Sequence, residues 1–451
     1  MKTTRTVSES IAKTFLFFAF ACISTVWATE GDSPLKVPYL DEKGETQYCE
    51  NPIHLTDDVH NLNELNKPDC FVVTGKVQLK RALDYNGSVN LILADGADLS
   101  IETGKDEKAA IDVNGNLNIY VQSVGEQMGK LSITAEQRGF SINGVITING
   151  GNITATAEEH FSHSVDFVIN GGNITTTTGW NGITATRDVT INGGNLIVRV
   201  RDDAIHSDWS IAINSGNTII INGGNIITET AEGLIARDSV IINDGNISAT
   251  GKAGINAGGY LIMNNGNITA ECENYGLLAS EKILIRGGSV IAINGKYDSM
   301  RAKRIILGYN SANDSIKVDN YFSEKEFCTV DNQAFKDEDG NIYRGTLDAY
   351  HLAGKTLKPA CLFSSCDENN GFKPITAHNP KIAYANGQLT IIVPRATNVK
   401  VEIFDLMGNL VKKSFGNTET HAVSLNYLKR GAYVARVTAN HAVRSLRFQV
   451  N

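Results

Sequence analysis

Apolar and polar residues alternate in short runs through the middle of the chain, and the alternation restarts at a regular interval. A five-residue phrase, INGGN in its commonest form, begins at Ile148, Ile169, Ile191, Ile221, Ile242, Met263 and Ile285. Successive copies begin 21, 22, 30, 21, 21 and 22 residues apart. β-Prone runs such as ITATA follow the phrase and are too short for helices. A fixed period of this length indicates a solenoid.

A single unit cannot bury its isoleucines, but units stacked about 4.8 Å apart form an inner apolar column. We therefore predict an all-β fold, a right-handed parallel β-helix of about ten rungs over residues 69–310. The fourth position of the phrase is glycine in all seven copies, which indicates a turn with positive φ or close backbone approach. The asparagines should form amide ladders. This also explains the sequons at Asn152, Asn173, Asn246 and Asn267 without glycosylation.

The 30-residue interval departs from the repeat. It contains a partial copy, INSGN at 213–217, and we interpret it as a unit carrying an insertion of eight residues. A second apolar column follows the first by 13 to 15 residues, at Ile183, Ile205, Leu234, Ile255, Leu277 and Met300. Stacking then predicts one column of Trp180, Asp202 and Ala231 beside a second column of Asn181, Asp203 and Glu232.

Acidic side chains gather at this departure. The candidate metal ligands are Asp202, Asp203, Asp208 and Glu232. Four carboxylates on adjacent rungs need neutralisation, and Ca²⁺ prefers several such oxygen ligands. Salt bridging to Arg199 and Arg201 on a solvated face is the alternative.

The mature chain has its two tryptophans, Trp180 and Trp209, beside the acidic group. An indole is a platform for a sugar ring, although it also covers corners between rungs. The ligand-binding candidates are Trp180, Asn181, Arg199, Arg201, His206, Trp209, Arg237 and Tyr275. No residue is singled out as catalytic, and the alternating position of His206 favours a solvent-facing side chain.

The N-terminal residues 1–28 combine three cations, the apolar run TFLFFAFACISTV and small residues at its end, as in a secretory signal peptide. No other stretch is long enough to span a membrane as a helix. Residues 29–68 form a lead segment, 311–362 a β-rich closing cap and 363–380 a linker. Cys49 with Cys70, and Cys361 with Cys366, are plausible disulfides. KDEDGNIY at 336–343 fits a hairpin turn better than a calcium loop.

Charge is unevenly distributed. The chain carries −8 in total, with +7 in residues 379–451 and +2 in the signal peptide, which leaves −17 for residues 29–378. An acidic body argues against nucleic-acid binding, which requires basic patches.

DDAIHSD at 202–208, followed by AEGLIARDSVIINDGNI, resembles a secreted carbohydrate-binding β-helix family related in fold to pectate lyases. The resemblance implies calcium and sugar-polymer binding, with Asp202, Asp203, Asp208 and Glu232 as the acidic cluster. Ala204 departs from the family's glycine, and the phrase occurs in full once. RDDAIHSD also resembles the paired-aspartate phrase of polygalacturonase-type hydrolases, but their other motifs are absent.

Residues 381–451 alternate like a small β-sandwich. FDLMGNLVKK and LKRGAYVARV resemble the type IX secretion C-terminal sorting domain, which implies delivery through the periplasm to the outer surface of a Gram-negative bacterium. We therefore expect a secreted or surface-bound protein that binds a polysaccharide, such as a plant cell-wall glycan, with Ca²⁺ as a candidate cofactor. A polysaccharide lyase or hydrolase and an adhesin with a protein ligand remain the alternatives.

Overall fold

The regular secondary structure of the described residues is almost entirely β-strand. The computed structural model describes residues 36–450, with gaps at 60, 65–69, 202–209, 361–380 and shorter segments beyond residue 294. In these ranges the one helix is a 3₁₀ turn, Leu62–Glu64, and no helix is long and apolar enough to cross a membrane. The signal peptide and the Cys361–Cys366 pairing lie outside the described residues. The chain forms two compact units, which are described separately.

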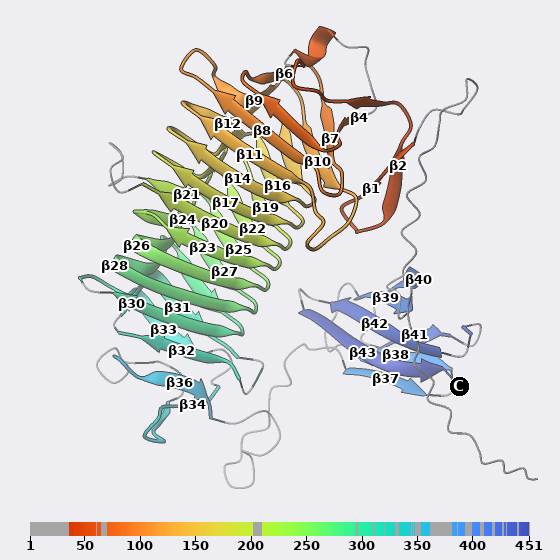
Figure 1. Cartoon of the computed structure of the whole chain (residues 1–451). Helices are drawn as coiled ribbons and strands as arrows, with labels where there is room; N and C mark the ends of the chain where they lie inside the picture. Colours follow the sequence, from red (N-terminus) through yellow and green to blue (C-terminus); the bar gives the residue numbers. More distant parts are fainter. Residues whose placement is uncertain are drawn as a thin grey trace, which may run out of the picture. The chain divides into compact units, whose positions relative to one another are not determined.

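The first unit is a parallel β-solenoid of about 12 turns (Figure 1), which confirms the predicted architecture and exceeds the ten rungs expected. Each turn contributes one strand to each of three faces, and each strand pairs in parallel with the equivalent strand one turn later. We number the faces 1, 2 and 3 in chain order and name the corners between them edge 1–2, edge 2–3 and edge 3–1.

Face 1 comprises β3 (Pro52–His54), β4 (Cys70–Val73), β7 (Val89–Leu93), β10 (Leu117–Val121), β13 (Val145–Ile148), β16 (Asp166–Ile169), β19 (Val189–Ile191), β22 (Thr218–Ile221), β25 (Ser239–Ile242), β27 (Tyr260–Met263), β29 (Lys282–Ile285) and β31 (Met300–Leu307). Face 2 comprises β5 (Lys76–Leu79), β8 (Asp98–Thr103), β11 (Lys130–Ala135), β14 (Asn152–Ala157), β17 (Asn173–Thr178), β20 (Asn195–Val200), β23 (Asn225–Glu229), β26 (Asn246–Ala257), β28 (Asn267–Ala279), β30 (Ser289–Asn294) and β32 (Ser315–Val318). Face 3 comprises β6 (Leu83–Tyr85), β9 (Ala109–Val113), β12 (Arg138–Ile142), β15 (Ser162–Ser164), β18 (Ile183–Ala185), β21 (Ile211–Ser215), β24 (Glu232–Ala236), the later halves of β26 and β28, and the start of β31.

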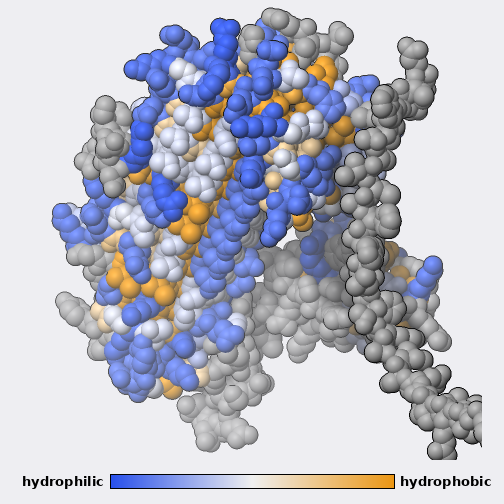
Figure 2. All heavy atoms as spheres, viewed as in Figure 1, coloured by the Kyte–Doolittle hydropathy of each residue, from blue (hydrophilic) through white to orange (hydrophobic). Residues whose placement is uncertain are grey.

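The first apolar residue of the repeated phrase lines the interior in every copy. All seven of these side chains are at most 1% exposed. Because side chains alternate across a strand, the residue before each of them faces outward, where threonine, valine and larger aliphatic residues are half-exposed. Figure 2 shows the result as columns of pale and apolar side chains beside a hydrophilic stripe along the solenoid.

The repeat is interrupted at edge 2–3, between β20 and β21. Ile213 pairs with Ile183 on one side and with Leu234 on the other, so Ile213 holds the place in the second apolar column that the sequence assigned to Ile205. The partial copy INSGN belongs to β21 on face 3 and not to edge 1–2, so its interpretation as a further phrase is wrong. The extra residues therefore fall between Val200 and Ile211, where 202–209 lie outside the described chain.

Edge 1–2 is built from the glycines and asparagines of the phrase. The fourth-position glycines all have positive φ, from 86° at Gly194 to 110° at Gly245. A Cβ at Gly172 would lie 2.7 Å from the carbonyl oxygen of Gly151, so successive turns also approach closely. Both expectations for the glycine are confirmed.

Two asparagine ladders run along this edge, as predicted. In each ladder the side-chain Nδ2 donates to the Oδ1 of the asparagine one turn earlier, at 2.7–2.8 Å. The first ladder contains Asn149, Asn170, Asn192, Asn222, Asn243 and Asn264, and the second contains Asn152, Asn173, Asn195, Asn225, Asn246 and Asn267. The sequon asparagines thus have their amides engaged in the scaffold.

Both ends of the solenoid carry strands that differ from the repeat. At the start, β1 (Val37–Leu40) pairs antiparallel with β2 (Thr46–Cys49), and the predicted disulfide joins Cys49 to Cys70 with Cα atoms 6.2 Å apart. At the other end, β33 (Tyr321–Thr329) pairs with β31, and β36 (Thr356–Pro359) lies antiparallel to β32.

The segment 336–343 is a hairpin, as the sequence favoured. β34 (Phe335–Lys336) pairs antiparallel with β35 (Ile342–Tyr343). The carboxylate of Asp337 accepts hydrogen bonds from the backbone N–H of Asn341 at 2.8 Å and the Tyr343 hydroxyl at 2.9 Å. These oxygens close the turn.

The C-terminal residues form two antiparallel sheets. One contains β37 (Lys381–Ala385), β38 (Gln388–Ile392) and β41 (Thr420–Ser424), and the other contains β39 (Val399–Asp405), β40 (Leu410–Gly416), β42 (Gly431–Ala439) and β43 (Ala442–Val450). Leu389 and Ile391 of the first sheet share a buried cluster with Val401 and Val437 of the second. Two sheets around one apolar core form the expected sandwich.

Candidate functional site

Edge 2–3 carries several of the candidate residues, including Asn181 and Glu232. Asn181, at the start of face 3, is buried, and its Oδ1 accepts a hydrogen bond from the backbone N–H of Ile211 at 2.9 Å. Ile211 in turn pairs with Glu232 one turn later. The column is therefore Asn181, Ile211 and Glu232. The Asn181 side chain stabilises the contact between two successive turns of this column.

The neighbouring column contains Trp180, Ser210 and Ala231, each one residue earlier in the same register. The predicted placement of Asp202 and Asp203 in these two columns is therefore wrong. The insertion, residues 202–209, precedes Ser210 in the chain and lies outside the described residues. The other candidates within it, His206, Asp208 and Trp209, also lie outside the described residues.

Trp180 is the one tryptophan among the described residues, and 38% of its surface is accessible. Its ring stacks on that of His160, from the preceding turn, with centroids 5.2 Å apart and an interplanar angle of 26°. His160 is only 9% exposed, and burial, assisted by the positive charge of Arg138, lowers its pKa to about 4. The imidazole is thus neutral near pH 7 and forms a fixed support for the indole.

The two candidate arginines are paired with glutamates that the sequence did not single out. Arg199 donates through Nε and Nη2 to the two carboxylate oxygens of Glu229, at 2.7 and 3.1 Å. Arg201 makes a similar two-point contact with Glu158, and this contact holds the pKa of Glu158 below its ordinary value.

Gly179 permits the contact between Arg201 and Glu158, which lie two turns apart. Gly179 occupies the turn between them in the same column. A Cβ there would lie 2.3 Å from the carbonyl oxygen of Glu158 and 3.2 Å from Nη2 of Arg201. Glycine is therefore needed for the guanidinium to pass over this turn.

An open groove of about 570 Å³ follows on the next three turns. Its lining is mostly polar: Thr177, Arg199, Val200, Arg201, Ser210, Glu229, Thr230, Ala231, Thr250, Gly251, Lys252 and Glu273. This volume lies within the usual range for small-ligand sites. Its arginines are charge-balanced by their glutamate partners, so the lining favours a neutral polar ligand.

Tyr275 and Tyr297 form a second aromatic pair on edge 2–3. Their rings stack with centroids 5.4 Å apart and an interplanar angle of 15°, and Nζ of Lys296 lies 5.3 Å from the centroid of Tyr297. Tyr275 pairs in register with Ala253, which pairs with Glu232.

Glu232 and Arg237 lie on different edges of the solenoid, so they do not belong to one cluster. Glu232 is half-buried, and burial raises the pKa of its carboxyl group. Arg237 is exposed at edge 3–1, after β24, and so lies away from edge 2–3. Within the described ranges no group of three or more acidic, histidine or cysteine side chains is arranged to hold a metal ion.

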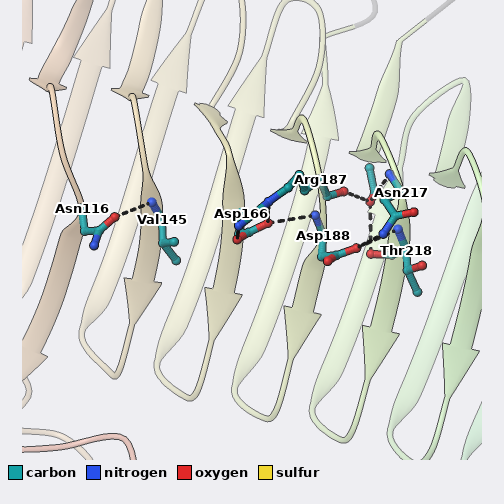
Figure 3. Close-up of polar contacts among 8 residues, drawn as sticks. Asn116, Val145, Asp166, Arg187, Asp188, Asn217 and Thr218 are labelled. Carbon is teal, nitrogen blue, oxygen red and sulfur yellow. Dashed lines mark hydrogen bonds and ion pairs between the residues drawn. The ribbon is translucent and has the colours of Figure 1, made fainter.

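A set of polar side chains on edge 3–1 escaped the sequence analysis. Asn116 and Asp188 accept hydrogen bonds through Oδ1 from the backbone N–H groups of Val145 and Thr218, at 2.9 and 3.0 Å (Figure 3). The available signal was that Asn116 and Asp188 immediately precede face 1 strands.

Asp166 serves the same edge. It accepts from the N–H of Asp188 at 3.1 Å and pairs with Arg187 (Figure 3), and these contacts lower its pKa although burial opposes them. The two aspartates thus join successive turns and do not form an acid–base pair.

Two family models match the chain. Residues 66–225 match the model described as carbohydrate-binding domain-containing protein, a segment that includes His160, Trp180 and Arg201. Residues 383–451 match the secretion system C-terminal sorting domain. No curated protein matches the chain. The two matches together support a carbohydrate-binding protein that its type IX sorting domain directs to the cell surface or the medium.

Proposed function

We propose that edge 2–3 of the solenoid binds a neutral polysaccharide chain, with Trp180 as a platform for one sugar ring and the adjoining groove as the site for its neighbours. The observation that carries this proposal is the stacking of Trp180 on the buried ring of His160. A supported, partly exposed indole presents apolar surface to the C–H groups of a sugar without losing side-chain freedom on binding.

The groove supplies the polar part of the recognition. Thr177 and Thr250 bring accessible hydroxyl groups to its lining, and Arg199 with Glu229 supplies charged donors and acceptors held in place by each other. Paired charges of this kind hydrogen-bond to sugar hydroxyls without demanding a charged ligand. A neutral glycan therefore suits the site better than a polyuronate.

Calcium is the cofactor we propose for the insertion. The insertion contains three aspartates, Asp202, Asp203 and Asp208, whose carboxylates we propose as its ligands. Oxygen donors of this type are those that Ca²⁺ prefers. When bound, the ion would neutralise the negative charge of these aspartates.

The test is the retardation of the mature chain in native gels that contain cellulose, xylan or polygalacturonate. We expect retardation by a neutral polymer, loss of it in Trp180→Ala, and no loss in Tyr260→Ala, which removes an exposed tyrosine from face 1. Equal retardation of Trp180→Ala and the unaltered protein would contradict the proposed site.

Two further measurements separate the alternatives. Retardation that disappears with EDTA and returns with calcium supports the metal, whereas retardation unchanged by EDTA argues against it. Release of reducing ends or unsaturated products from any polymer would identify an enzyme, and absence of binding to every polymer would favour an adhesin with a protein ligand.

A further inference from the structure

The stacked tyrosines on edge 2–3 lie at the far end of the groove from Trp180. Trp180 shares its column with Ser210, Ala231, Lys252 and Asn274 on the four following turns. At about 4.8 Å per turn, Tyr275 lies roughly 19 Å along the axis from Trp180. The groove-lining residues come mainly from the turns between these two aromatic groups.

The orientation of Tyr275 follows from its neighbours in register. Tyr297 comes from the following turn and covers one side of the ring, so the other side is turned back toward the groove. The residue at that position is Ala253, whose side chain is a single methyl group and is half-exposed. No large side chain of this column therefore occupies the space in front of the ring.

Glu232 stands on the far side of that space. It lies two turns before Tyr275 in the same column, about 10 Å along the axis. A ring stacked on Tyr275 occupies part of this distance and brings its hydroxyl groups within reach of the carboxyl oxygens of Glu232. Within the described chain, Glu232 makes no side-chain hydrogen bond or ion pair that would occupy those oxygens.

We propose that Tyr275, Ala253 and Glu232 form a second sugar subsite, in which a pyranose ring stacks on Tyr275 over Ala253 and hydrogen-bonds to Glu232. This inference rests on the proposed function and extends it, because the subsite lies outside the segment 66–225 matched by the carbohydrate-binding model. The edge then takes an extended linear glycan that spans the groove from Trp180 to Tyr275. A short oligosaccharide reaches only one of the two aromatic groups.

The experiment is a calorimetric titration of the mature chain with soluble oligomers of increasing length, taken from the polymer that retards it. We expect the affinity of the unaltered protein to rise with length until the oligomer spans both aromatic groups. Tyr275→Ala should lose about 10-fold or more in affinity for the long oligomers and keep its affinity for the shortest ones. Tyr275→Phe retains the ring and should bind like the unaltered protein.

A second variant tests the space itself. Ala253→Phe places a ring where the sugar is expected, so it should reproduce the loss caused by Tyr275→Ala while leaving the tyrosine present. Tyr260→Ala is the control for removing a tyrosine elsewhere on the solenoid, and thermal melting checks that each variant is folded.

The outcomes separate the subsite from the proposed function. Unchanged affinity of Tyr275→Ala for long oligomers, or affinity that does not depend on length, would overturn the subsite. Binding of no oligomer by the unaltered protein would overturn both proposals. Loss in Tyr275→Ala with none in Trp180→Ala would support the subsite and contradict the role of Trp180.

Discussion

Substituting Gly224 by alanine tests whether close contact between turns of edge 1–2 limits the fold. Gly224 has φ of 92°, and an added Cβ would lie 2.8 Å from the carbonyl oxygen of Gly194. The left-handed backbone costs an L-residue about 1–2 kcal/mol. Forcing a methyl group into a packed position costs typically about 1–3 kcal/mol more. We therefore expect Gly224→Ala to lower the free energy of unfolding by about 2–5 kcal/mol.

Two other glycines separate these contributions. Gly96 has φ of 73° with no atom within 4 Å of an added Cβ, so Gly96→Ala isolates the backbone cost. At Gly193 an added Cβ lies 3.1 Å from the carbonyl oxygen of Asn170, while φ is outside the left-handed range, so Gly193→Ala isolates a mild form of the contact. Gly96→Ala should cost about 1–2 kcal/mol and Gly193→Ala about 1 kcal/mol.

Urea denaturation followed by circular dichroism is the appropriate assay for this series. Solenoids lose cooperativity when one turn is weakened, so the slope of the transition must be compared as well as its midpoint. If Gly224→Ala is no more destabilising than Gly96→Ala, the close approach of successive turns contributes no strain and the reasoning fails.

Three further predictions concern the ladder, the buried histidine and the disulfide. Asn195→Ala removes one hydrogen bond to Asn173 and one from Asn225, and urea denaturation should show a loss of about 1–2 kcal/mol; an unchanged midpoint would count against the ladder. His160 has a folded pKa of about 4 against 6.5 in the unfolded chain, so the unfolded chain binds more protons between these values and stability should fall as pH decreases from about 6.5 to 4. The loss of stability due to His160 is at most about 3 kcal/mol. Melting curves of His160→Asn across this pH range should therefore show a smaller decrease in stability than those of the unaltered protein. Reduction of Cys49–Cys70, which are 21 residues apart, should destabilise the first turns by about 3 kcal/mol and expose β1 and β2 to limited proteolysis; identical cleavage rates with and without reductant would refute this.

The sequence predicted the scaffold well because the backbone of each turn pairs only with the turns next to it. A requirement at one position, such as positive φ at Gly194, recurs in every copy and becomes visible as a period. The same logic predicted the asparagine ladders and the size of the insertion.

The candidate site was harder to predict because it depends on where the repeat is interrupted. The letters INSGN imitate the edge 1–2 phrase, but their backbone belongs to face 3, and this error displaced the aspartates into columns that Ser210 and Ile211 occupy. The stack of His160 on Trp180 could be predicted only from the register between two successive turns. In that register Glu159 lies one turn before Trp180 in the same column, which brings His160 beside the indole.

Ion pairs that skip a turn leave no periodic signal. Arg201 reaches Glu158 across Gly179, so the partners are 43 residues apart and the essential residue between them has no side chain. Only the three-dimensional arrangement joins these three positions.

The antiparallel strand at the end of the solenoid has a consequence for how the protein behaves in concentrated solution. A parallel ladder presents, at its last turn, an edge onto which the first turn of another molecule could add, and repetition of that step would build a fibre. β36 lies against β32 in the opposite direction, at Leu357 and Ile316, and so changes the hydrogen-bonding pattern there. At the opposite end the hairpin of β1 and β2 is tethered to β4 by the disulfide. The repeat that makes the molecule stable is thus prevented from templating its own polymerisation.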